Sequence, residues 1–378
     1  MEFSLNEEQE MLKTMARDFL ENECPKTFVR QMMEDDTGHS PELWKKMAEV
    51  GWLGLILPEE YGGSAMNFRD LSILCEEMGR AMMPGPYLST LLLAGLPILS
   101  AGTDEQKSEF LPRIANGDAV FTLAVTERDG DFWAEGVQMK ATRAGHDYIL
   151  DGTKYFVPDA RAADYIIVAA RTRRSENPEE GITLFLVNTA EWGVYTAPLT
   201  AMDETRKQYQ LVLTRVAVPS RYVIGEVDKG WQVLQDMSLK MTAALCAEMV
   251  GGCEWVLETT VNYAKERVQF GVPIGSFQVI KHKCADMYSA LEYARSMMEA
   301  AAEAIREDNP EAPVLVSMAK SLCADAYRLI TDHAVQVHGG IGFTWDHDLH
   351  LYFKRARADD TAFGDSIYHR ELIAQSLD

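Results

Sequence analysis

The chain is poor in basic side chains and has no long apolar run. Its 378 residues include 36 Lys and Arg against 58 Asp and Glu, a formal net charge of −22. Such a surface repels nucleic-acid phosphates and anionic lipid headgroups, so we expect neither kind of partner. Met1 is followed by Glu2, Glu7 and Glu8 rather than by a basic start and an apolar stretch. We therefore expect no signal peptide, no membrane span and a cytoplasmic location.

Cysteine and histidine are too sparse and too scattered to predict a metal site or a disulfide framework. The six cysteines form no pair at a metal-ligand spacing, and we expect reduced thiols in the core. The histidine pairs His333 with His338 and His347 with His350 have no Cys or carboxylate at a usual spacing to complete a zinc set. We therefore predict no bound metal.

The spacing of apolar residues divides the chain into three segments. In residues 1–118 and 227–378, apolar side chains recur every three or four positions, which predicts helices. Residues 119–226 carry short β-branched and aromatic runs separated by Gly, Asp, Asn or Pro, which predict strands. The fold class is therefore α+β and multidomain, with an N-terminal all-α domain, a middle β-barrel or β-sandwich domain and a C-terminal four-helix bundle.

Single elements follow from the same patterns. The helices expected after the first are 67–83, 87–101, one that opens at 102–107, 231–267, 280–306 and 314–338, with a short one near His369. The expected strands are 121–125, 148–150, 165–170, 183–187 and 210–218. Ser4 or Asn6 is expected to cap the first helix, and Ser276 to cap the helix that starts near Ile280.

Residues 263–287 read as the end of one helix, a turn and the start of another. The turn is indicated by glycines and a proline between positions 271 and 275. Arg267 and Phe270 are thereby held at a helix C-terminus, where a forked donor and an aromatic face suit a planar cofactor that bears phosphates. An arginine that satisfies the last carbonyls of its own helix is the simpler alternative.

Together with Gln336-Val337-His338-Gly339-Gly340-Ile341-Gly342-Phe343, this stretch resembles the two C-terminal signatures of the acyl-CoA dehydrogenase family of flavoproteins. The resemblance covers essentially the whole chain. It implies bound FAD, an acyl-CoA substrate that loses an α-proton and a β-hydride, and an electron-transferring flavoprotein as acceptor. Because this family shares FAD between neighbouring subunits, it also implies a homotetramer or an α2β2 heterotetramer.

The resemblance assigns the expected FAD contacts residue by residue. Those that match the family fully are Arg267, Phe270, Gln336, Gly339 and Gly340. Further expected contacts are Leu123, Val125 and Thr126 at a strand end, and Gly364 and Asp365 near the C-terminus.

Two segments depart from the family pattern on the cofactor side. Phe156 replaces a stacking Trp and can still stack, whereas Pro158 replaces a hydroxyl donor and has neither hydroxyl nor N–H. The segment 128–133 replaces the usual P-x-x-G-S-D, which leaves open how the CoA arm is held.

The implied reaction needs a carboxylate base near the α-carbon and hydrogen-bond donors at the thioester oxygen. In the best-known members of the family, the base is a Glu in a motif that corresponds here to residues 363–370. Phe363 stands in its place, although its backbone N–H could still donate to the thioester oxygen. A second place that supplies the base in some members corresponds to Met241, which is apolar too.

Glu248 is the expected base. A further branch of the family carries Ala-Glu before a Gly-containing turn of the long helix, which appears here as Ala247-Glu248 followed by Gly251 and Gly252. Apolar residues share the helical face of Glu248, and burial among them would make its carboxylate a stronger base. A structural Glu paired with an Arg or Lys of the bundle is the alternative, and Asp365 is the other candidate carboxylate.

The predicted function is FAD-dependent α,β-dehydrogenation of an acyl-CoA thioester. The segment Trp345-Asp346-His347-Asp348-Leu349-His350-Leu351-Tyr352 resembles a subclass that acts on bulky, branched or cyclic acyl groups. Two alternatives remain. One is a catalytically silent partner subunit of a heteromeric dehydrogenase, and the other is an oxygen-using oxidase or monooxygenase on the same fold.

Overall fold

The structure is a computed structural model that describes residues 5–130 and 133–377. Its residues pack into two compact units, each built from several chain segments. The helical unit contains the described residues up to Arg30, Asn67–Met83 and the chain from Thr242 onward, and the sheet unit contains Gln31–Met66 and Pro84–Met241. The predicted boundaries at 118 and 226 concern segments of sequence rather than packing, and they stay a prediction.

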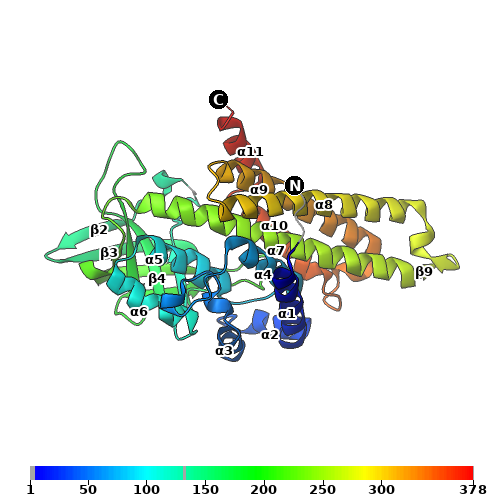
Figure 1. The fold of residues 1–378 in the computed structure, drawn as a ribbon, viewed down its shortest axis with the longest axis horizontal. Helices are drawn as coiled ribbons and strands as arrows, with labels where there is room; N and C mark the ends of the chain where they lie inside the picture. The colour runs from blue at the N-terminus through cyan, green and yellow to red at the C-terminus, as the bar shows by residue number, and fades with distance from the viewer. Residues whose placement is uncertain (1–4, 131–132, 378) are drawn as a thin grey trace. The chain divides into compact units, whose positions relative to one another are not determined.

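An eight-stranded sheet forms the centre of the sheet unit. Its strand order is β6-β7-β3-β2-β4-β5-β8, and β1 lies parallel to β4. Most other neighbours are antiparallel, including β3 with β7 and β4 with β5. The strands are β1 (Phe121–Ala124), β2 (Lys140–Ala144), β3 (Asp147–Pro158), β4 (Tyr165–Arg171), β5 (Ile182–Asn188), β6 (Val194–Pro198), β7 (Gln208–Pro219) and β8 (Val223–Ile224) (Figure 1).

All five predicted strands are confirmed, although β3 and β7 are longer than expected. The strands β2 and β6 were not predicted because most of their side chains are exposed and show little apolar alternation. By contrast, the residues 166–170 inside β4 are all buried and therefore form a continuous apolar run.

Helices and short turns complete the sheet unit: α3 (Pro41–Glu49), α5 (Leu96–Ala101), α6 (Asp104–Ala115), the 3-10 turns Trp52–Gly54 and Glu59–Tyr61, and the first turns of α7. The single helix expected at 87–101 is instead a π-helix, Ser89–Gly95, followed by α5. Pro97 has no N–H to donate to the carbonyl four residues back, and the Leu96 N–H reaches the Leu91 carbonyl five residues back.

The helical unit is organised around α9 (Ala312–His338), which packs against α8 (Gln278–Arg306), α10 (Leu349–Thr361) and α11 (Ser366–Gln375) (Figure 1). It also contains α1 (Glu7–Glu23), α4 (Phe68–Ala81), the start of α2 (Lys26–Glu34) and most of α7 (Gly230–Glu266). The helical and β character expected of each part of the chain is confirmed. Helix α10 was not predicted, because charged residues interrupt its apolar positions.

The predicted helix caps have different outcomes. Asn6 caps α1 in a capping box with Gln9, as expected, while Ser4 lies outside the described residues. Ser276 does not cap α8, which begins at Gln278 after the cap residue Phe277. The Ser276 hydroxyl instead donates to the Pro273 carbonyl at 2.7 Å, because residues 274–276 form a 3-10 turn of their own.

Helices α4 and α7 cross with their backbones in contact. A Cβ atom at Gly79 would lie 2.0 Å from the carbonyl oxygen of Glu248, and one at Gly251 would lie 1.8 Å from that of Glu76. Only glycine allows this approach, since any larger residue would push the helices apart. The missing side chain of Gly251 thus makes room for a neighbouring helix.

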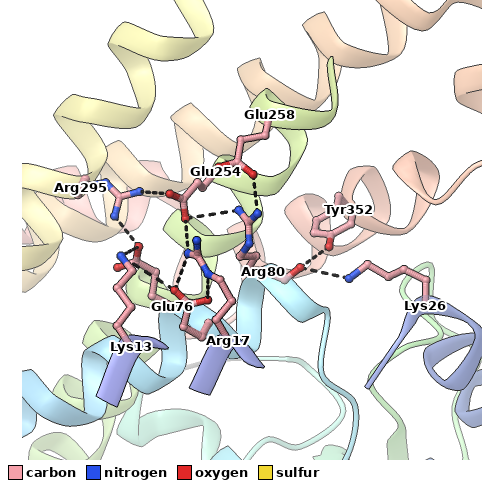
Figure 2. A network of polar contacts seen from close by, with 10 residues as sticks. Lys13, Arg17, Lys26, Glu76, Arg80, Glu254, Glu258, Arg295 and Tyr352 are labelled. Atoms are coloured by element: carbon pink, nitrogen blue, oxygen red, sulfur yellow. Dashed lines mark hydrogen bonds and ion pairs between the residues drawn. The ribbon is translucent and has the colours of Figure 1, made fainter. Parts of the chain in front are cut away.

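A network of ion pairs surrounds this crossing (Figure 2). The carboxylates of Glu76, Glu77 and Glu254 lie within 4.8 Å of one another, which is close enough to hold a metal ion. Cationic side chains nevertheless contact all three, with Lys13 3.1 Å from Glu76 and Arg17 2.8 Å from Glu77. Arg80 and Arg295 complete the set. These cations balance the carboxylates, so the cluster is a structural ionic network that joins α1, α4, α7 and α8.

Candidate functional site

Glu248 lies in the interior of the helical unit and forms an ion pair with Arg355. Oε1 of Glu248 accepts a hydrogen bond from Nη1 of Arg355 at 2.5 Å, and both side chains are almost completely buried. Helix α7 supplies the carboxylate and α10 supplies the guanidinium. This is the structural arrangement that was considered as the alternative to a catalytic base. The assignment of Glu248 as the base stays a prediction.

Phe363, Gly364 and Asp365 form the turn between α10 and α11. The backbone is left-handed at Phe363 (φ 58°) and at Gly364 (φ 95°). Asp365 is the N-cap of α11, and its Oδ1 accepts from the Tyr368 N–H at 2.8 Å. The expected flavin contact at Asp365 therefore already has a local structural role. No described residue accepts a hydrogen bond from the Phe363 N–H, which leaves this donor available.

Arg267 and Phe270 lie on a β-hairpin that follows α7. Strands β9 (Val268–Gln269) and β10 (Val272–Pro273) pair antiparallel, and the turn between them has left-handed backbone at Phe270 and Gly271. The Phe270 ring is 92 % exposed. Within the described part of the chain, no acceptor is found for the Arg267 guanidinium. It is therefore not occupied with the carbonyls of its own helix, and both side chains are free to contact a ligand.

Gln336, Gly339 and Gly340 lie at the end of α9, near the end of α7. The contact between the two helix ends is a stack of Tyr263 on His338, with ring centroids 4.3 Å apart. Burial lowers the pKa of His338, whose Nδ1 lies 2.8 Å from the Ala334 carbonyl. A Cβ atom at Gly339 or Gly340 would meet nothing within 4 Å. The hairpin that follows α7 and the glycine turn that follows α9 therefore lie near one another.

The sheet unit holds the remaining expected contacts. The Tyr155 N–H donates to the Thr126 carbonyl at 2.9 Å, which sets Thr126 at the end of β1 beside Phe156 on β3. Phe156 is 60 % exposed and has left-handed backbone (φ 54°). The side chain of Leu123 is buried, so only its backbone is available to a cofactor. In the segment 128–133, residues 131 and 132 lie outside the described residues.

Lys154 holds the Thr126 strand end in place. Its side chain is fully buried, and its ammonium donates to the Val125 carbonyl at 2.8 Å and to Oε1 of Glu127 at 2.7 Å. Burial lowers the pKa of Lys154 to about 8, although the nearby Glu127 carboxylate raises it. The charge of the lysine is thus balanced inside the unit, and the two residues fix the strand on which Thr126 lies.

Sequence models of one family match nearly the whole chain. They are described as the N-terminal, middle and C-terminal domains of acyl-CoA dehydrogenase, and they match residues 6–118, 122–216 and 228–377. The chain belongs to the acyl-CoA dehydrogenase family. Proteins of this family are FAD-dependent oxidoreductases, and this chain is an oxidoreductase of that class with FAD as its cofactor.

Relatives of the family agree over the full length. "Probable acyl-CoA dehydrogenase YngJ" of Bacillus subtilis (strain 168) is 31% identical over 382 residues, covering 100% of both chains. The structure of butyryl-CoA dehydrogenase from Megasphaera elsdenii has a TM-score of 0.92 at 28% identity and covers 100% of both chains. A ChsE4-ChsE5 complex from Mycobacterium tuberculosis has a TM-score of 0.89 at 26% identity, with 100% of this chain and 99% of that one covered.

The exposed groups fit the FAD of an acyl-CoA dehydrogenase. In the helical unit, the guanidinium of Arg267, which has no partner among the described residues, the exposed ring of Phe270 and the open turn at Gly339 and Gly340 suit phosphates and a planar ring. In the sheet unit, the exposed ring of Phe156 offers a stacking face. No helix in the described ranges combines the length and apolar character needed to cross a bilayer.

Sequence reasoning missed Arg355, the partner of Glu248. A signal for it exists in α10, where Tyr352, Arg355, Ala356 and Asp359 recur at helical spacing and are all buried. A charged residue in a buried stripe needs an opposite charge, and Glu248 stands in such a stripe on α7. Buried charges of opposite sign on two helices can therefore predict a pair, provided that both helices are recognised.

Proposed function

We propose that this chain is a subunit of an FAD-dependent acyl-CoA dehydrogenase that polarises the thioester but takes its α-proton base from another chain. The observation that supports this proposal is the buried ion pair of Glu248 with Arg355. Oε1 of this carboxylate is occupied by a charged hydrogen-bond donor, which a substrate would have to displace before the carboxylate could act as the base. Phe363 and Met241 stand at the other two expected places and have no proton-accepting group.

The chemistry divides into a hydride transfer and a proton transfer. The bound flavin supplies the hydride acceptor. The α-proton becomes acidic only when the thioester oxygen is polarised, and the N–H of Phe363, which no described residue accepts, is suited to that oxygen. This donor does not depend on the side chain, so polarisation survives the replacement of the family's Glu by Phe.

The length of α7 supports a site that more than one chain completes. Arg267 follows Glu248 by nineteen positions along α7 and its end, which corresponds to about 28 Å at 1.5 Å per residue. The hairpin contacts and Glu248 are therefore far apart within one chain. The ChsE4-ChsE5 complex, as its name says, joins two different proteins. We infer a tetramer for this chain, and an α2β2 heterotetramer agrees best with a missing base.

A second candidate is a self-sufficient dehydrogenase in which Glu248 is the base. It is favoured by the position of Glu248 on α7 beside the buried residues Leu245 and Ala247, in the Ala-Glu pattern of one branch of the family. It requires Arg355 to release the carboxylate when substrate binds. The acyl group, which we propose to be bulky, branched or cyclic, and an electron-transferring flavoprotein as acceptor are common to both candidates.

The two candidates predict different behaviour of the chain when it is purified alone. The protein is loaded with FAD and titrated under anaerobic conditions with a panel of straight, branched and cyclic acyl-CoAs, while the flavin absorbance is followed. We expect acyl-CoA to bind without bleaching the flavin. Bleaching of the wild type that is abolished in a Glu248→Gln protein that still folds and keeps its FAD would replace our proposal by the second candidate. Rapid oxygen uptake by the chemically reduced protein would indicate an oxidase instead.

A further inference from the structure

The turn that carries Phe363 has a backbone that its own sequence does not favour. A non-glycine residue with left-handed φ costs about 1 kcal/mol, and Phe363 has no polar side chain to offset it locally. Gly364 is also left-handed, and a Cβ atom there would lie 2.3 Å from the Tyr368 ring. The conformation must therefore be imposed by contacts from outside the turn.

Lys320 of α9 supplies the first of these contacts. Its side chain is fully buried, and Nζ donates to the Asp360 carbonyl at 2.9 Å and to the Gly364 carbonyl at 2.7 Å. Burial lowers the pKa of this lysine. Burial of an ammonium costs free energy unless it is hydrogen-bonded. Here the two hydrogen bonds hold the end of α10 and the turn at a constant separation. One side chain thereby binds the backbone at both ends of the segment 360–364.

His369 of α11 supplies the second contact. Its Nε2 lies 2.9 Å from the Phe363 carbonyl, so this nitrogen must carry the proton and donate it. Its Nδ1 then accepts from the Ser317 hydroxyl, 3.3 Å away on α9. Burial lowers the pKa of His369 to about 4, although the bond to the Phe363 carbonyl raises it. The ring is therefore neutral near pH 7 and held in one tautomer.

The two side chains bind the carbonyls of Phe363 and Gly364 and leave the Phe363 N–H without an acceptor among the described residues. We propose that Lys320 and His369 are positioning residues that aim the Phe363 N–H at the thioester oxygen of the substrate. This inference rests on the proposed function, because it assigns these residues to the polarising donor. Neither residue contacts the substrate in this account, and each acts only through the turn.

Infrared difference spectroscopy tests the inference. The probe is 3-thiaoctanoyl-CoA labelled with ¹³C at the thioester carbonyl, which cannot complete the dehydrogenation because sulfur replaces its β-carbon. The full-length, FAD-loaded protein should lower the carbonyl stretching frequency of the bound probe, since a hydrogen bond weakens the C=O bond. Lys320→Met and His369→Phe should each lose at least half of that shift, while His369→Gln, which keeps a donor near the Nε2 position, should retain most of it.

Lys26→Met is the matched control. Lys26 belongs to the same unit and donates to two backbone carbonyls, those of Arg80 at 3.2 Å and Ala81 at 2.7 Å, but these lie at the end of α4 (Figure 2). This variant removes a similar lysine and should keep the full shift. Circular dichroism and thermal melting identify any variant that does not fold. If Lys320→Met fails in this way, the comparison of His369→Phe with His369→Gln still decides.

The possible failures are distinguishable. A wild-type protein that binds the probe without any carbonyl shift would refute the proposed function itself. A wild-type shift that Lys320→Met and His369→Phe both leave unchanged would overturn the positioning role while the proposed function stands. An equal loss of shift in Lys26→Met would also overturn it, because the effect would then be one of general destabilisation.

Discussion

Arg355 and Glu248 form a buried ion pair that joins α10 to α7 inside the helical unit. Removal of one member takes a charged hydrogen-bond partner away from the other in the interior, and breaking a buried pair in this way typically costs about 3–5 kcal/mol. We expect Glu248→Gln and Arg355→Met each to lower the free energy of unfolding by about 3 kcal/mol in urea denaturation. The double variant Glu248→Leu/Arg355→Met should lose much less than the sum of the single changes.

The exposed pair of Lys240 with Asp236, which has a comparable distance of 2.9 Å, provides the control. Lys240→Met should change the stability by only about 0.5 kcal/mol, since exposed ion pairs contribute little. If the two single variants of the buried pair are as stable as the wild type, the pair is not structural, and Glu248 becomes available again as a base.

Phe363→Glu should restore a base at the position where the family usually has one. The left-handed backbone at this residue is already present, so the new carboxylate takes the place of the phenyl ring without a change in the turn. We expect the FAD-loaded variant, alone and under anaerobic conditions, to be bleached by acyl-CoA at least about tenfold faster than the wild type, the gain expected of a positioned general base. Phe363→Gln has the same shape without a base and should stay inactive.

Phe156→Gly should raise the stability of the protein while it weakens FAD binding. Phe156 has left-handed backbone and an exposed ring, so glycine relieves strain and loses little burial. We expect a gain of about 1 kcal/mol in the stability of the FAD-free protein, together with weaker FAD binding in a fluorescence titration. Tyr195→Gly on strand β6, where the backbone is regular, should instead destabilise. Unchanged FAD affinity would remove Phe156 from the cofactor site.

Acid should destabilise the protein partly through His369. Its pKa is about 4 in the folded chain against 6.5 for an unperturbed histidine, so the unfolded chain binds the proton first as the pH falls. Stability should therefore drop between about pH 6.5 and pH 4, by roughly 3 kcal/mol from this residue. His369→Gln should show a shallower loss over the same range in urea denaturation at several pH values. Equal slopes would mean that His369 is not held neutral.

Gly251→Ala should disrupt the crossing of α4 and α7. The added methyl group would lie 1.8 Å from the carbonyl oxygen of Glu76, and neither backbone can move without separating the helices. We expect a loss of roughly 3 kcal/mol, the upper end of the usual cost of overpacking. Gly340→Ala, where a Cβ meets nothing within 4 Å and φ is not positive, should leave the thermal stability nearly unchanged. A stable Gly251→Ala protein would contradict the close contact.

Much of the fold could be predicted from local patterns. The switch from helical spacing to alternating runs near Val120, and back near Gly230, reflects which faces of each element are buried, and the structure has strands and helices in those places. Helix α10 was missed because the charged residues Arg355 and Asp359 interrupt its apolar stripe. The cap at Ser276 was wrong because the backbone of residues 274–276 turns by itself before α8 begins.

The sequence could predict a site residue only where its residue type and its place in a motif identify it. The sequence alone determined the family signatures, the absence of a carboxylate at Phe363, and Glu248 as a lone acid on an apolar face. Only the tertiary structure decided that Glu248 meets Arg355 across 107 positions of sequence, and that Lys320 and His369 close on the carbonyls of the Phe363 turn. A buried charge or donor costs free energy unless it has a partner, so such residues are expected to be paired. Which residue is the partner depends on how the helices cross, and no local sequence pattern encodes that crossing.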